Sequence, residues 1–178
     1  MTNTEIRTEI KKKRSSMTET EVFAYSDIIF DKIKELDFVF KKQNFMIYKD
    51  FKNEVKTDKI IDLLTRFGKT VAHPITLGDN MIAAIPQGNE TTLDSFGIEI
   101  PKNYSIMDMP EVIFVPLVAC DENKNRLGFG KGYYDKYLSG RKVLKIGLCY
   151  DFQVTKEIAA QPWDVPLDMI ITEKRIIR

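Results

Sequence analysis

The stretch from Glu111 to Ala119, EVIFVPLVA, decides the fold of this chain of 178 residues. It is rich in β-branched side chains and almost continuously apolar, which is typical of a strand in the middle of a sheet that is covered on both faces. Covered sheets of this kind are mostly parallel, with helices connecting one strand to the next. We therefore expect strands and helices to alternate on either side of this stretch.

Short apolar stretches do alternate with stretches of helical period along the chain. The predicted strands, besides 111–119, are 44–51, 70–75, 80–85, 142–150 and 167–173. The predicted helices are 4–15, 19–36, 58–69 and 130–140. This order predicts an α/β fold, a three-layer Rossmann-like sandwich with a mostly parallel central sheet and helices on both faces. The length suits one core, so we expect a single domain, 1–178.

Two local signals refine this prediction. Thr18 precedes the second helix and Glu21 follows three residues later, which is the spacing of a capping box. The segment 86–110 is polar, with scattered prolines and glycines. We interpret it as a long surface excursion that lies near a binding site, because long loops in compact domains are commonly functional.

Composition and charge exclude several classes of protein. Lys and Arg total 27 against 26 Asp and Glu, so the net charge of +1 supplies no overall field for binding nucleic acid. Cys120 and Cys149 lie in apolar surroundings without the spacing of a metal site, and we expect buried thiols. The N-terminal stretch has no apolar signal region and no segment is apolar for roughly 18 residues, so we expect a cytoplasmic protein that binds no membrane.

A glycine-rich stretch, RLGFGKGYYDKY at 126–137, follows the central strand. Glycines at 128, 130 and 132 allow positive φ and let several N–H groups surround an anion. Arg126 and Lys131 can add positive charge, and a helix beginning near Tyr133 would add its positive end. Asp135 would repel a phosphate unless a divalent cation such as Mg²⁺ joins the two. The alternative is a purely structural role, in which the glycine-rich turn caps a helix and Tyr133, Tyr134 and Tyr137 are packing residues.

The longer stretch RLGFGKGYYDKYL resembles the signature of the 5-formyltetrahydrofolate cyclo-ligase family, also called 5,10-methenyltetrahydrofolate synthetase. The resemblance extends over almost the whole chain. It includes Arg7, NEVKT at 53–57, VIFVPLVACD at 112–121, KIGLCYDFQ at 145–153 and PWDVPLDMIITE at 162–173.

The resemblance implies an ATP- and Mg²⁺-dependent carbon–nitrogen cyclo-ligase of folate one-carbon metabolism. Such an enzyme converts 5-formyltetrahydrofolate to 5,10-methenyltetrahydrofolate and releases ADP and phosphate. An N-formyl oxygen is a poor leaving group, so it must be phosphorylated before N10 attacks the formyl carbon. Charge placed around the phosphoryl group is then the main contribution of the protein.

The resemblance also assigns roles to residues, on the positions that match. The implied catalytic residues are Arg126, Lys131 and Tyr133. The implied ATP contacts are Asn3, Arg7, Arg126, Leu127, Gly128, Phe129, Gly130, Lys131, Gly132, Tyr133 and Tyr134. The implied folate contacts are Lys49, Phe51, Glu54, Phe129, Gly130, Lys131, Gly132 and Tyr133. The implied metal ligands are Asp135 and Asp164, and Asp168 could replace Asp164.

The sequence departs from the family pattern at two places. Asn3 stands where a phosphate-binding lysine is expected, so one positive charge is missing. Lys11, one helical turn beyond Arg7, could compensate, or the run EIKKKR could simply be a solvated helix face. In FGIEIP, Ile100 stands where the family more often has glutamate.

Other functions stay open at this point. The main alternative is a non-catalytic module that binds a nucleotide or another anion, and a second is a related α/β enzyme acting on sugar phosphates or CoA esters. The single histidine, His73, cannot form a metal cluster and is interpreted as a strand-end residue. As partners we expect ATP and 5-formyltetrahydrofolate but no nucleic acid, and we expect a monomer.

Overall fold

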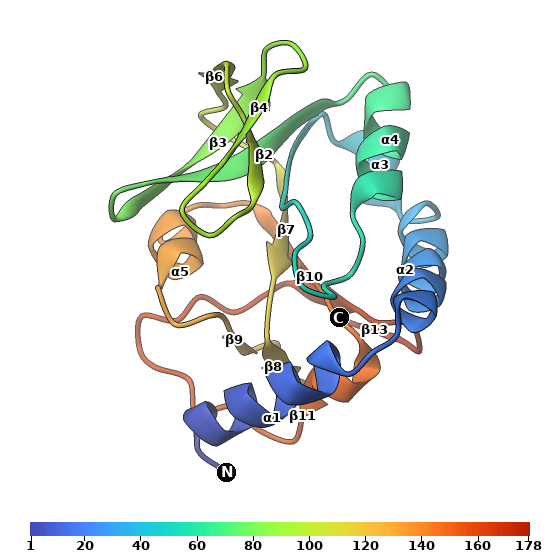
Figure 1. Ribbon diagram of the computed structural model, residues 1–178, viewed down its shortest axis with the longest axis vertical. Helices are drawn as coiled ribbons and strands as arrows, with labels where there is room; N and C mark the ends of the chain where they lie inside the picture. Colours follow the sequence, from blue (N-terminus) through green and yellow to red (C-terminus); the bar gives the residue numbers. More distant parts are fainter.

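The strand predicted from EVIFVPLVA lies in the middle of an eight-stranded sheet in the computed structural model, which describes residues 1–178 (Figure 1). This strand, β7 (Val112–Pro116), lies between β1 (Asn44–Ile47) and β10 (Leu144–Leu148) and is parallel to both. β2 (Thr70–Leu77) is parallel to β1, and β12 (Met169–Ile171) is parallel to β10. The predicted mostly parallel sheet is confirmed.

Antiparallel strands form both edges of this sheet. β13 (Ile176–Ile177) pairs with β12 at one edge. At the other edge β3 (Asn80–Pro86) pairs with β2, and β6 (Tyr104–Ile106) pairs with β3. The complete order is β13-β12-β10-β7-β1-β2-β3-β6.

The order of the parallel strands positions the site. It is β2-β1-β7-β10-β12, so the chain goes from β1 to a neighbour on one side and later continues from β7 on the other side. At such a reversal the connections that leave two adjacent strands turn away from each other, and a crevice remains at the carboxyl ends of these strands. Here the crevice is expected between Tyr48, which follows β1, and Pro116, which ends β7.

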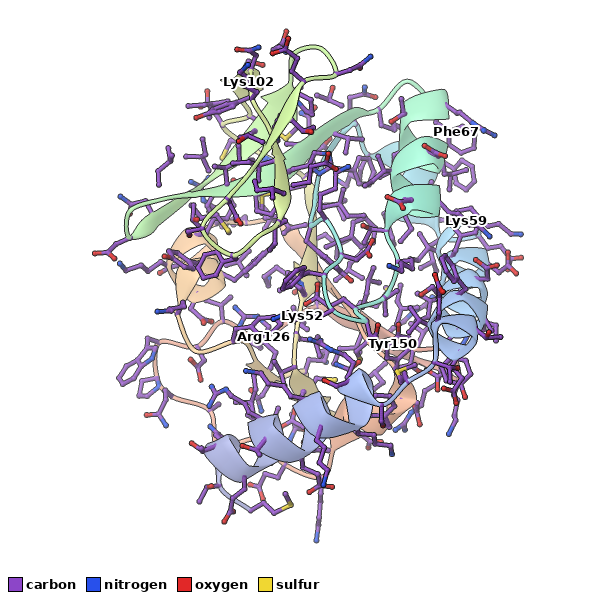
Figure 2. All side chains as sticks on the ribbon, in the orientation of Figure 1. Lys52, Lys59, Phe67, Lys102, Arg126 and Tyr150 are labelled. Atoms are coloured by element: carbon purple, nitrogen blue, oxygen red, sulfur yellow. The ribbon has the colours of Figure 1, made fainter.

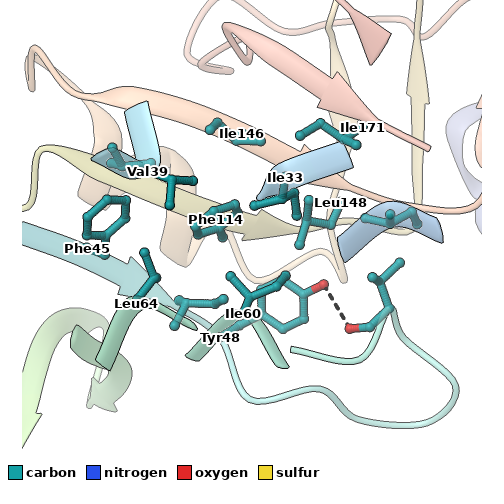
Figure 3. Close-up of a cluster of buried hydrophobic side chains, with 14 of the residues drawn as sticks. Ile33, Val39, Phe45, Tyr48, Ile60, Leu64, Phe114, Ile146, Leu148 and Ile171 are labelled. Atoms are coloured by element: carbon teal, nitrogen blue, oxygen red, sulfur yellow. Dashed lines mark hydrogen bonds between the residues drawn. The ribbon is translucent and has the colours of Figure 1, made fainter. Parts of the chain in front are cut away.

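Helices cover both faces of the sheet, as predicted. One face packs against α2 (Glu19–Ile33), α3 (Asp37–Lys41) and α4 (Asp58–Arg66). Figure 3 shows Ile33, Val39, Ile60 and Leu64 from these helices around Phe45, Phe114, Ile146, Leu148 and Ile171 of the sheet. At the border of this cluster the Tyr48 hydroxyl donates to the carbonyl of Val55 at 3.3 Å (Figure 3). The other face has only one helix, α5 (Tyr133–Leu138).

The helix ends agree with the predictions only in part. The capping box of α2 is present, since Thr18 Oγ1 accepts from the Glu21 N–H at 3.2 Å. The predicted extension of this helix to Leu36 is wrong, because α2 ends at Ile33 and Leu36 has an extended backbone. A separate short helix, α3, follows, and the continuous apolar period of the sequence hides this break. None of the helices combines the length and the apolar composition that crossing a bilayer requires.

The predicted strand at 111–119 is divided into two strands. Pro116 has no N–H to continue the ladder, and β7 ends there. The chain resumes as β8 (Ala119–Asp121), which lies between β9 (Arg126–Leu127) and β11 (Val154–Thr155) in a small second sheet. The short 3₁₀ helix η1 (Asp151–Gln153) leads into β11.

The first helix, α1 (Asn3–Ser15), packs on this second sheet and not on the large one (Figure 1). Its Ile6 and Ile10 contact Val118 and Leu127 in a separate apolar cluster. This packing places α1 across the region where the strands of the large sheet end.

The segment 86–110 contains strands that its polar composition does not indicate. β4 (Thr91–Leu93) and β5 (Glu99–Pro101) form a hairpin, and β6 joins the edge of the large sheet. The prediction for the two cysteines is confirmed, since Cys120 and Cys149 are buried free thiols with their sulfur atoms 3.6 Å apart.

The core on the α2 side makes a testable contribution to stability. Phe114 is fully buried in the middle strand, at 0% exposure. Phe114→Ala should lower the free energy of unfolding by about 3–5 kcal/mol, because it removes buried apolar surface and leaves a cavity. Urea unfolding followed by circular dichroism measures the change.

The matched control for this prediction is Leu93→Ala. Leu93 lies in β4 and is 68% exposed. Its truncation should change stability by less than about 0.5 kcal/mol. Equal losses in the two variants would contradict the assignment of Phe114 to the core.

Candidate functional site

A pocket of about 1200 Å³ opens at the carboxyl ends of β1 and β7, where the strand order predicts a crevice. Tyr48 and Pro116 line it, together with side chains from α1, the β4-β5 hairpin and the segment around Asp164. Lys52 and Arg126, which are labelled near the centre of Figure 2, also line it. The prediction that 86–110 lies near a site is confirmed, because Phe96 in this segment lines the pocket.

The glycine loop, residues 128–132, forms one wall between β9 and α5. Gly130 has φ +99° and Gly132 has φ +69°, a region that favours glycine. A Cβ added at either residue would meet no other atom within 4 Å. The loop therefore has open space beside its backbone. α5 has only six residues, so the contribution of its positive end is small.

Positive side chains surround this loop. Arg7 Nε donates to the carbonyl of Gly128 at 2.9 Å and so fixes α1 to the loop. Lys11 Nζ lies 5.2 Å from the centre of the Phe129 ring. Lys131 also lines the pocket. Among all the residues that line it, lysines and arginines outnumber aspartates and glutamates. The pocket therefore attracts anions although the net charge of the chain is only +1.

Asn3, which replaces the expected lysine, is used to attach α1 to a neighbouring segment. Its Nδ2 donates to the carbonyl of Ala159 at 2.8 Å, and its Oδ1 accepts from the Ala159 N–H at 3.3 Å. Asn3 does line the pocket, but it brings no charge. Lys11 lies on the same helix and lines the same pocket, so it can supply the missing charge.

Arg126 is not a free cation in the pocket. Its side chain is almost fully buried, and Nη2 donates to Asp135 Oδ1 at 2.8 Å. The same carboxylate oxygen accepts from the Val165 N–H at 3.1 Å. Arg126 Nε is buried without a hydrogen-bond partner. From the sequence we expect Arg126 to contact phosphate directly. In the structure its positive charge is instead balanced by Asp135.

Asp164 and Asp168, the two alternatives for the second metal ligand, have different surroundings. Asp135 and Asp164 both line the pocket: Asp135 accepts from the N–H of Val165, the residue after Asp164, and Asp164 Oδ2 accepts from the Gln161 N–H at 2.8 Å. Asp168 instead accepts from the backbone N–H and the Nζ of Lys145, at 2.7 and 2.8 Å, and does not line the pocket. The structure has no group of three or more His, Cys, Asp or Glu side chains that could hold a metal ion. A pair of carboxylates fits Mg²⁺, which is commonly held by one or two carboxylates plus phosphates and waters.

Glu54 also lines the pocket and is only 7% exposed. Its Oε2 accepts from the Phe51 N–H at 3.0 Å, and its Oε1 lies 3.8 Å from Arg14 Nη1. Burial raises the pKa of Glu54 to about 7, although the charge of Arg14 and the Phe51 N–H oppose this rise. Lys49 also lines the pocket. A carboxylate held in this way can accept hydrogen bonds from a heterocyclic N–H group.

The tyrosines that follow the glycine loop have different surroundings. The Tyr133 hydroxyl donates to the carbonyl of Gly78 at 3.2 Å and so connects α5 with the β2-β3 turn. Tyr137 is buried as a packing residue. The Tyr134 hydroxyl is buried without a hydrogen-bond partner, and burial raises the pKa of Tyr134 well above its ordinary value. The hydroxyls of Tyr134 and Tyr137 are both buried without a hydrogen-bond partner.

Sequence reasoning missed several lining residues. Arg14 belongs to the run EIKKKR, but the interpretation of this run as a solvated face is wrong for Arg14, which is 5% exposed. His73 lies inside β2 and not at a strand end, and its Nδ1 is 2.9 Å from the carbonyl of Ile47. Trp163 lines the pocket although it is 69% exposed. Only its position beside Asp164 could have indicated this.

Comparisons with known proteins agree with this geometry. A family model described as the 5-formyltetrahydrofolate cyclo-ligase family matches residues 1–173. A 5-formyltetrahydrofolate cyclo-ligase of Mycoplasma genitalium is 39% identical, over 72% of this chain and 72% of the relative. One of Haemophilus influenzae is 29% identical, over 92% of this chain and 93% of the relative.

Solved structures show the same fold. The 5,10-methenyltetrahydrofolate synthetase of Aquifex aeolicus superposes with a TM-score of 0.89 and 30% identity, covering 100% of this chain and 93% of the other. The synthetase of Mycoplasma pneumoniae gives a TM-score of 0.77 and 28% identity, covering 97% and 99%. The match over nearly the full length and the shared architecture establish the conclusion that the motif suggested: this chain belongs to the 5-formyltetrahydrofolate cyclo-ligase family of enzymes.

Proposed function

We propose that this protein catalyses the ATP- and Mg²⁺-dependent cyclisation of 5-formyltetrahydrofolate to 5,10-methenyltetrahydrofolate, with release of ADP and phosphate. One observation carries the proposal beyond family membership. A single pocket is lined by an open glycine loop, by several cations and by a buried carboxylate, Glu54. A triphosphate and a folate can therefore meet inside it.

The glycine loop and α1 receive the nucleotide in this proposal. The N–H groups of the loop, with Lys131, Arg7 and Lys11, offset the charge of the phosphates. Asp135 and Asp164 are the residues that would hold Mg²⁺, which neutralises charge on the phosphate oxygens when it is bound. Arg126 keeps Asp135 oriented through their 2.8 Å contact.

Folate occupies the end of the pocket at Glu54. The Glu54 carboxylate accepts hydrogen bonds from pterin N–H groups, and Phe51 and Phe129 offer apolar faces for the rings. Lys49 adds a positive charge at this end. The formyl oxygen then faces the glycine loop, where the γ-phosphate is expected.

The reaction follows from this arrangement in two steps. The formyl oxygen attacks the γ-phosphorus and the bond to ADP breaks, which leaves a phosphorylated formyl group. N10 then attacks the formyl carbon and loses its proton, and phosphate departs with the electrons of the C–O bond. In this proposal Lys131, which lines the pocket, stabilises negative charge on the transferred group.

We propose further that one domain, residues 1–178, performs this reaction as a monomer, because the pocket receives residues from Asn3 to Asp164 of one chain. The alternative of a non-catalytic binding module is supported by Asn3, which lacks the charge of the expected lysine. The buried Glu54 argues against it, because binding a nucleotide alone does not require a desolvated carboxylate in the same pocket. A role on sugar phosphates or CoA esters is disfavoured by the family match over residues 1–173.

The metal assignment predicts a contrast between two aspartates. Asp164→Asn should lower kcat/KM by about 10- to 100-fold and raise the Mg²⁺ concentration needed for half-maximal rate, because a ligand carboxylate is lost. Absorbance of methenyltetrahydrofolate, with and without ATP and Mg²⁺, measures the rate. The control is Asp168→Asn, which should leave the Mg²⁺ requirement unchanged. Product without ATP, or an equal effect of both variants, would overturn the assignment.

The glycine loop predicts a second contrast, between Gly130→Ala and Gly88→Ala. Both glycines have positive φ, +99° and +86°, and open space around a new Cβ. Each substitution should cost about 1–2 kcal/mol of stability. Only Gly130→Ala should weaken nucleotide binding, by about tenfold, because roughly 1.4 kcal/mol of N–H contacts to phosphate is lost.

Calorimetric titration with ATP and urea unfolding separate these two effects of the glycine substitutions. Gly88 does not line the pocket, so its variant reports the cost of strain alone. Equal nucleotide affinities in the two variants would count against phosphate binding at the loop.

A further inference from the structure

We propose that Arg14 is a positioning residue for the folate-binding carboxylate: it holds Glu54 toward the pocket and connects it to the glycine loop. The inference rests on the proposed function, since it assumes that Glu54 binds the folate. It adds a residue that the family motif does not include. Arg14 lies two helical turns beyond Arg7 on α1, so one helix would contact both the glycine loop and Glu54.

The Arg14 side chain is placed between three parts of the site. Its Nη1 lies 3.8 Å from Glu54 Oε1 and donates to the carbonyl of Leu117, just beyond β7, at 3.5 Å. Its guanidinium carbon lies 5.6 Å from the centre of the Phe129 ring in the glycine loop. Both partners of the ion pair are more than nine-tenths buried. A buried arginine with these contacts constrains the carboxylate and the loop together.

The backbone of α1 holds the loop that carries Glu54. Lys52 and Asn53 have φ +47° and +58°, a conformation that costs energy in residues other than glycine. Asn53 Nδ2 donates to the carbonyls of Arg14 and Met17, both at 3.1 Å, at the end of α1. The strained turn is thus held by the same helix end whose side chain holds the carboxylate. Two independent contacts therefore position Glu54.

The charge of Arg14 also affects the protonation of Glu54. The titratable groups that face this carboxylate are Arg14 from α1, Asp50 from its own loop, Tyr48 after β1, Tyr134 from α5 and Tyr150 after β10. Arg14 is the only one whose charge lowers the pKa of Glu54, which burial raises to about 7. Without Arg14 the carboxyl group would keep its proton at neutral pH and would lose capacity to accept hydrogen bonds.

The test compares Arg14→Gln, Arg14→Lys and Lys12→Gln. Arg14→Gln should raise KM for 5-formyltetrahydrofolate by about tenfold, the effect of losing roughly 1.4 kcal/mol, and leave KM for ATP within about twofold. The acidic limb of the pH profile of kcat/KM for the folate reports the free enzyme. It should move to higher pH by about 1 unit or more, as expected when an opposite charge at this distance is removed. Arg14→Lys keeps the charge and should restore the acidic limb.

Lys12→Gln is the matched control, because Lys12 is exposed on the same helix and does not line the pocket. It should leave both KM values and the limb unchanged. An unmoved limb in Arg14→Gln, or equal rises of both KM values, would overturn the inference. If Arg14→Gln does not fold, Arg14→Lys decides alone, since a limb shifted despite the retained charge would contradict the role. Failure of the proposed function would appear differently, as absence of product in the wild type.

Discussion

The reversal of strand order between β1 and β7 is the constraint on which the rest of the structure depends. β1 and β7 are adjacent and parallel, but the connections that leave them go to opposite sides of the sheet. The backbone groups at these strand ends must then be satisfied by loops and side chains that arrive from elsewhere. Pro116 ends the β7 ladder at this point and directs the chain into the small second sheet. The pocket therefore follows from topology before any functional side chain is considered.

Two ion pairs with mostly buried side chains line this pocket. Their small contribution to stability suggests that they serve ligand binding. Arg126 pairs with Asp135, and Arg14 pairs with Glu54. Burying charges in this way adds little net stability, because desolvation offsets most of the attraction. An apolar pair of similar volume would serve the fold at least as well. The charges are better explained by ligands that use them, since both acids line the pocket and each arginine fixes the orientation of its acid.

The sequence predicted the sheet and its helices well because those elements depend on local pattern. The apolar stretch at 111–119, of which Val112–Pro116 forms the middle strand β7, and the capping box at Thr18 are examples. The break between α2 and α3 was missed, since the apolar period continues through Leu36 while only the backbone changes. Strands β4 and β5 were missed for a different reason, because they are short and exposed and pair only with each other. Pattern alone carries no signal for such strands.

Local pattern also failed to predict parts of the candidate site. Helix α1 shows why, because its contacts are with residues far away in the chain. The resemblance identified Arg7 and Glu54 by matching positions, but it did not indicate that one helix contacts both the glycine loop and Glu54. Arg14 looked like part of a solvated run because its neighbours Lys12 and Lys13 are exposed. Its burial depends on Glu54 and Leu117, which are 40 and 103 residues away in the chain.

Asn3 follows the same logic. As a departure from the family pattern it reads as a lost charge, yet in the fold it bonds twice to the backbone of Ala159. These bonds secure the first turn of α1, the turn that leads to Arg7 and its contact with Gly128. By the resemblance Asn3 lacks the charge of the expected lysine, and in this structure it attaches the helix that carries Arg7 and Lys11. Lys11 on that helix is then the residue best placed to supply the missing charge.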